Sequence, residues 1–138
     1  MTDIETAKEN LDGHSICLCR GGEIITDDGR GISPMMRFLA ERRDLTGYAA
    51  ADVIVGKAAA LLFVKAGIVC VHGKTMSVSA RDLLEQHSIP CSYDTLTEKI
   101  INRQGTDICP MEKTVEAISD ADEAYEALGR KLAEMRAE

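Results

Sequence analysis

The sequence lacks the features that mark several broad classes of protein. Its longest unbroken apolar run, Ala58 to Val64, is far too short to span a bilayer. The first residues, Met1 to Glu5, form neither the basic segment nor the apolar segment of a signal peptide. No tandem repeat, low-complexity tract or linker is present. We therefore expect a cytoplasmic protein that does not use a membrane as its partner.

Cysteine pairs and an excess of positive charge are absent as well. The 5 cysteines include no Cys-x-x-Cys pair, so we expect reduced thiols rather than a disulfide scaffold. The chain has 16 Lys and Arg against 23 Asp and Glu, a net charge of −7, which argues against a nucleic acid partner. A length of 138 residues fits a single domain, residues 1–138.

What is present begins with a β-α-β pattern in the middle of the chain. Residues 51–55 and 68–73 are rich in β-branched side chains, and the ten residues between Gly56 and Gly67 read as a helix that Gly67 ends. By the handedness of parallel strand connections, the unit should cross over right-handedly. It supplies the centre of the predicted sheet.

The remaining segments extend this sheet and cover it. Residues 15–20 and 23–27 predict a hairpin that turns at Gly21-Gly22, and Ser33-Pro34 should open a helix with Ser33 as its N-cap. Further helices are predicted at residues 2–13, 77–87, 96–101, 110–118 and from 120 onward, with a short strand at 91–93. This order predicts a three-layer α/β/α domain with a mixed five-stranded sheet and an N-terminal hairpin. In such folds, ligands bind beyond the carboxyl ends of the strands.

Lys57 is the unusual residue of the central unit. A cation in the first turn of a helix opposes the helix dipole by about 0.3–1 kcal/mol. Either Lys57 bends away into water and Gly56 only allows a tight turn, or a negative group lies beside both residues. The second alternative predicts an anion site at Gly56 and Lys57. It is not a P-loop, because the Gly-x-x-x-x-Gly-Lys-[Ser/Thr] spacing is missing.

Two further signals surround the same predicted pocket. Gly31 and its neighbour Gly29 would let backbone amides approach a ligand, with Arg30 as a movable cation, although the loop could equally be a plain connection. Ser33 opens the helix that follows. Asp52, on the strand that leads to Gly56, is a candidate pocket residue, or simply a residue at the start of a strand.

Cys109-Pro110 is a third signal. Proline at the first helical position places the thiol at the N-cap, where the positive end of a helix lowers the pKa of a cysteine. Arg103 and Lys113 are close in sequence. The pattern predicts a reactive or ligand-contacting Cys109, with a buried inert thiol as the alternative. Only His72 among the histidines could face the pocket, and we predict neither a metal nor a cofactor.

Two stretches carry a resemblance to a known family. They are Val55-Gly56-Lys57-Ala58-Ala59-Ala60-Leu61-Leu62 and Asn102-Arg103-x-Gly105-Thr106-x-x-Cys109-Pro110-Met111-Glu112. Together with the order of elements, they resemble a prokaryotic family of uncharacterised domains with a cytidine deaminase-like fold. The resemblance covers the chain from about Leu11 to Leu128. It implies a pocket at which helix N-termini converge, a geometry that suits an anion.

The same resemblance separates this chain from the zinc deaminases. In those enzymes the helix after the hairpin opens with His-x-Glu or Cys-x-Glu, and the next helix opens with Pro-Cys-x-x-Cys. Here these places hold Ser33-Pro34-Met35 and Gly56-Lys57-Ala58, which contain no zinc ligand. Zinc-dependent deamination is therefore not expected.

The leading hypothesis is a zinc-free binding domain for a small anionic metabolite, for example a nucleotide. The predicted ligand-binding residues are Gly56, Lys57, Ser33, Arg30, Gly31, Asp52 and Arg103. A second hypothesis is an enzyme with Cys109 as nucleophile, in which Lys57 and Arg103 hold the charge of the substrate. A third is a homo-oligomeric interaction module that uses the apolar faces of the terminal helices.

Overall fold

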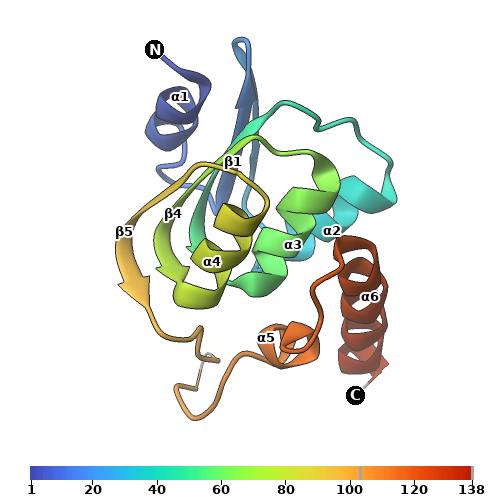
Figure 1. Cartoon of the computed structure of the whole chain (residues 1–138). Helices are drawn as coiled ribbons and strands as arrows, with labels where there is room; N and C mark the ends of the chain where they lie inside the picture. The colour runs from blue at the N-terminus through green and yellow to red at the C-terminus, as the bar shows by residue number, and fades with distance from the viewer. Residues whose placement is uncertain (103, 138) are drawn as a thin grey trace.

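The computed structural model describes residues 1–102 and 104–137, which fold around one five-stranded sheet (Figure 1). The strands are β1 (Ile16–Arg20), β2 (Glu23–Asp27), β3 (Ala49–Val55), β4 (Cys70–Ser77) and β5 (Cys91–Thr97). The helices are α1 (Asp3–Glu9), α2 (Ser33–Ala40), α3 (Lys57–Ala66), α4 (Val78–Gln86), α5 (Pro110–Val115) and α6 (Ala121–Ala137). The strand order is β2-β1-β3-β4-β5; β1 is antiparallel to both its neighbours, and β3, β4 and β5 are parallel. The predicted α/β class, with its mixed five-stranded sheet and N-terminal hairpin, is confirmed.

Helices cover both faces of the sheet (Figure 1). On one face α1 packs against β1 and β3, over a small cluster formed by Ala7, Leu11, Cys17, Cys19 and Ala51. On the other face α2, α3 and α4 bury the main core. Helices α5 and α6 pack against α3 from outside. The three layers are therefore unequal, with most of the helical mass on one side.

The side chains of β1 alternate between these two clusters. Ile16 and Leu18 join the main core, whereas Cys17 and Cys19 lie under α1. Because both faces of the strand are buried, its sequence is a continuous apolar run. The two thiols of this strand are packing groups.

Helix α3 is buried because nearly all of its residues are apolar. Seven of its ten residues are buried, and it packs against α4 and α6. Gly67 ends the helix at a φ of 81°, a left-handed conformation that favours glycine, and its N–H donates to the carbonyls of Phe63 and Val64. The predicted bounds of this helix are confirmed.

Strands β4 and β5 are longer than predicted. β4 continues past Gly73 to Ser77, because its parallel pairing with β3 goes on beyond Gly73. β5 continues to Thr97, so the helix predicted at residues 96–101 is wrong. β5 is an edge strand whose exposed side chains are mostly polar, which conceals its β character in the sequence.

The start of α2 also differs from the prediction. Ile32, not Ser33, occupies the N-cap position, and no side chain caps this helix end. The Ser33 hydroxyl instead donates to the Arg30 carbonyl at 2.7 Å. Ser33 therefore stabilises the turn that precedes the helix.

Candidate functional site

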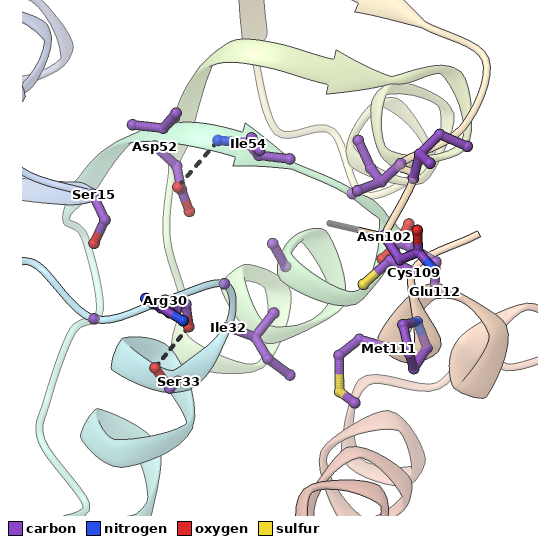
Figure 2. A pocket seen from close by; sticks show the side chains of 18 of the residues that line it. Ser15, Arg30, Ile32, Ser33, Asp52, Ile54, Asn102, Cys109, Met111 and Glu112 are labelled. Atoms are coloured by element: carbon purple, nitrogen blue, oxygen red, sulfur yellow. Dashed lines mark hydrogen bonds between the residues drawn. The ribbon is translucent and has the colours of Figure 1, made fainter. Parts of the chain in front are cut away.

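A hollow of about 990 Å³ lies at the carboxyl end of β3 (Figure 2). Among the described residues, five segments far apart in the sequence line it: residues 13–15, the loop before α2, the end of β3 with the start of α3, the segment that leads into α5, and α6. Apolar side chains of Ile32, Ala59, Met111, Leu132 and Met135 contribute much of the lining. Among the predicted site residues, the lining includes Arg30, Gly31, Ser33, Asp52, Gly56 and Cys109. The position agrees with the general rule for ligand sites in α/β folds.

Asp52 is the most buried charged residue of this lining. It is 7% exposed, and its side chain points from β3 toward the loop that carries Arg30 and Ile32 (Figure 2). One carboxylate oxygen accepts a long hydrogen bond, 3.4 Å, from the amide of Ile54. Burial raises the pKa of Asp52 to about 7, and the backbone amides of Ile54 and Val53 oppose this shift only in part.

The N-terminus of α3 is occupied by a carboxylate of the same chain. Glu112, from α5, accepts the amide of Lys57 at 2.8 Å and the amide of Ala58 at 2.9 Å. A carboxylate at this end of a helix is held by the free amides and by the dipole together. Burial raises the pKa of Glu112, while the two amides and the Lys57 ammonium act in the opposite direction.

Gly56 is explained by this contact. It is the N-cap residue of α3, at an ordinary φ of −95°, so no left-handed conformation requires glycine there. A Cβ at this position would lie only 2.5 Å from the carboxylate of Glu112. Glycine is therefore needed for the close approach of Glu112 rather than for a tight turn.

Lys57 does not line the large hollow. Its ammonium donates to the carbonyl of Glu116 at 3.0 Å, beside a separate small hollow of about 190 Å³. The negative group that the sequence led us to expect near Lys57 is present in the form of Glu112. Arg103, the other predicted cation, lies outside the described residues.

Cys109 is half-buried in the wall of the large hollow, at the predicted N-cap of α5 (Figure 2). Its thiol makes no capping hydrogen bond, and α5 has only 6 residues. His72 lies elsewhere: it is paired with Ala51 on the face that packs against α1, and its Nδ1 contacts the Ser92 hydroxyl at 2.7 Å. The prediction that His72 could face the pocket is wrong.

Sequence reasoning missed two features of the site. One is Glu112, although it lies within the second stretch of the resemblance, and its partners Lys57 and Ala58 lie in the first. The other is a pair at the rim, where His14 Nδ1 and Asp28 Oδ1 are 2.6 Å apart. Both depend on contacts between residues distant in sequence, for which no local pattern gives a signal.

The two helix starts at which the resemblance would place zinc ligands make other contacts in this structure. At the start of α2 the Ser33 hydroxyl is bonded to a carbonyl, and at the start of α3 the amides are bonded to Glu112. In the part of the chain that the structure describes, no group of three His, Cys, Asp or Glu side chains is placed to hold a metal. Within the same residues, no helix is both long and apolar enough to cross a membrane.

Comparison with known proteins places the chain in a family. A family model described as TM1506, a domain of unknown function (DUF1893), matches residues 7–132. The chain belongs to the DUF1893 family. The crystal structure of a DUF1893 family protein, TM1506 from Thermotoga maritima, is similar, with a TM-score of 0.85 and 25% sequence identity over 95% of this chain and 91% of that chain. No curated protein matches the chain. DUF1893 membership thus supports the fold and assigns no activity to the hollow.

Proposed function

We propose that this DUF1893 domain binds a small anionic metabolite, for example a nucleotide, in the hollow at the carboxyl end of β3. The observation that carries the proposal is the hollow itself, which is large enough for a metabolite and gathers Arg30, Gly31, Ser33, Asp52 and Cys109. We further propose a cytidine deaminase-like fold without the zinc chemistry. The hairpin followed by alternating helices and strands supports that assignment, and the start of α2 and of α3 lack the deaminase ligands.

Arg30 is the cation that we assign to the anionic group of the ligand. It is exposed, it lines the hollow, and its guanidinium has no hydrogen bond or ion pair within residues 1–102 and 104–137. Gly31 beside it has a φ of 54°, a left-handed conformation that favours glycine. Because glycine has no side chain, the loop backbone is open at the mouth of the hollow. A guanidinium can bind a phosphate or carboxylate with two parallel hydrogen bonds.

The start of α3 is a poorer anion site than the sequence suggested. Its first amides already bind Glu112, and the ammonium of Lys57 points into the other hollow. An external anion there would have to displace a carboxylate of the chain. The proposal therefore places the ligand's charge at Arg30, with Gly56 contributing only to the wall.

The test measures binding of adenosine 5′-monophosphate, adenosine and inorganic phosphate by calorimetry and thermal shift, within a wider panel of nucleotides and phosphorylated metabolites. A phosphorylated probe should stabilise the wild-type chain, and Arg30→Ala should weaken it about tenfold or more, since charge-assisted hydrogen bonds contribute about 1.5–3 kcal/mol. Lys8→Ala, on the far face of the sheet, is the matched control and should bind as wild type. Lys57→Ala tests the anion site at Gly56 and Lys57 that the sequence predicts. If no phosphorylated probe binds, the proposed function is wrong.

Cys109 supports a second candidate, an enzyme that forms a covalent intermediate with its substrate. The observation in its favour is that the thiol lines the same hollow as Arg30 and Asp52. In this alternative, Arg30 takes the place that the sequence assigned to Lys57. Faster alkylation of Cys109 than of the other cysteines would support it.

Three of the remaining predictions concern the chain's surroundings. Homo-oligomerisation through the terminal helices can be tested by measuring the solution mass. A cytoplasmic location and the absence of a nucleic acid partner also stay predictions, based on the charge and composition of the sequence.

A further inference from the structure

The carboxylate of Asp52 is buried without the partners that would stabilise its negative charge in the folded chain. It is 7% exposed in a hollow with largely apolar walls, and within the described residues its polar contacts are to backbone amides, Ile54 at 3.4 Å and Val53. Its neighbours across the sheet are Ile16 on β1 and Gly73 on β4, and neither has a polar side chain. An ionised carboxylate in such a place is costly unless a partner satisfies it.

The other carboxylates of the hollow already have partners. Asp28 pairs with His14 at the rim, and Glu112 accepts two amides of α3. Asp52 is therefore the carboxylate of the described lining whose side chain is left with accepting capacity toward the cavity. A fixed acceptor in an apolar wall is the arrangement by which binding sites orient a ligand.

We propose that Asp52 is a binding subsite for a nitrogen cation, an ammonium or amidinium group, that enters the hollow. The inference deepens the proposed function, on which it rests for the assumption that the hollow holds a ligand. The ligand would then be amphoteric, with its anionic group at Arg30 and its cationic nitrogen at Asp52. Two N–H groups of an amidinium can donate to the two oxygens of one carboxylate, and such charge-assisted bonds are strong where water is excluded.

The subsite should depend on pH. Burial raises the pKa of Asp52 to about 7, so the carboxyl is mostly protonated at pH 6 and mostly ionised at pH 8. A ligand that keeps its positive charge over this range should bind about tenfold more tightly at pH 8, because only the ionised form attracts it. Among the residues that the structure describes, the other charged or titratable groups that line the hollow are Arg30, Cys109, Glu112 and the pair of His14 with Asp28.

Benzamidine is a suitable probe, because it joins an amidinium to a flat apolar ring and carries no anionic group. Its affinity would be measured by calorimetry and by backbone amide NMR shifts at pH 6 and pH 8. We expect binding that shifts the amides of Val53 and Ile54 and strengthens about tenfold between the two pH values. Asp52→Asn should lose at least tenfold in affinity at pH 8, together with the pH dependence.

Asp82→Asn is the control, since it removes one exposed carboxylate on α4, outside the hollow. It should keep both the affinity and the pH dependence of benzamidine binding. The inference is overturned if benzamidine does not bind the wild-type chain, if Asp52→Asn binds it equally well, or if the shifted amides lie away from β3. Even if Asp52→Asn is poorly folded, the pH dependence of the wild-type chain and the positions of the shifted amides test whether benzamidine binds at Asp52.

The two proposals can fail separately. Benzamidine binding at Asp52 without any response to phosphorylated probes would refute the anionic ligand and leave the subsite intact. Binding of a phosphorylated probe through Arg30, with no benzamidine binding, would refute the subsite alone.

Discussion

Replacement of Asp52 by Asn should stabilise the free protein, and increasingly so as the pH rises. Burial raises the pKa of this carboxyl from 3.8 to about 7. A gap of about 3 pKa units corresponds to about 4 kcal/mol, at 1.36 kcal/mol for each unit. That figure is the upper limit of what the ionised carboxyl costs the folded state when no ligand is bound.

The direction follows from proton binding in the two states. Between about pH 4 and pH 7 the folded chain keeps the proton of Asp52 while the unfolded chain releases it, so the free energy of unfolding falls as the pH rises. Below about pH 4 both states hold the proton, and above about pH 7 the full cost is present. Asn does not titrate, so the difference between variant and wild type should widen by about 2–3 kcal/mol from pH 5 to pH 8.

Urea unfolding at pH 5 and pH 8 measures this difference, provided that the slope with denaturant is the same for both proteins. Glu112, whose pKa burial also raises, is present in both proteins and cancels in the comparison. A variant that is less stable than wild type at pH 8, or a difference that does not change with pH, would refute the reasoning and make Asp52 a structural residue.

Three further outcomes test the other contacts of the site. Gly56→Ala should lose about 1–3 kcal/mol in urea unfolding, because its Cβ would lie 2.5 Å from the carboxylate of Glu112; unchanged stability would contradict the close approach. Glu112→Gln should lose about 1–2 kcal/mol in the same assay, because one of the two α3 amides then faces an NH₂ group instead of an oxygen. Iodoacetamide should modify Cys109 faster than Cys91 at neutral pH, as followed by mass spectrometry, since burial and nearby Glu85 raise the pKa of the Cys91 thiol; equal rates would favour an inert Cys109.

Much of the fold could be predicted because glycine marks its turns. The hairpin turns at Gly21-Gly22, where both residues have positive φ angles of 56° and 90°, and α3 ends at Gly67 as expected. The failures fall where tertiary contacts outweigh local patterns. β5 is a strand to Thr97 because it pairs with β4, and its polar sequence gives no sign of this.

Local sequence patterns marked several residues that line the hollow, but not the contacts that these residues make. Arg30, Gly31, Asp52 and Cys109 each carried a local signal, and the structure brings all of them to one hollow. No local sequence pattern indicates the direction in which a long side chain points. The direction of Lys57 is set by the Glu116 carbonyl, which is 59 positions away in the sequence.

The contact of Glu112 with α3 limits where an anionic ligand can bind. A phosphate or carboxylate placed at the amides of Lys57 and Ala58 would replace a carboxylate already held at 2.8 and 2.9 Å, so the exchange would gain few new hydrogen bonds. Glu112 would then lose its two hydrogen-bond donors while it stays partly buried, and an unpaired buried carboxylate costs free energy. The two stretches that carry the family resemblance are thus joined to each other by this carboxylate. Since that internal contact uses the helix end, our proposal assigns the charge of the ligand to Arg30, whose guanidinium has no hydrogen bond or ion pair among the described residues.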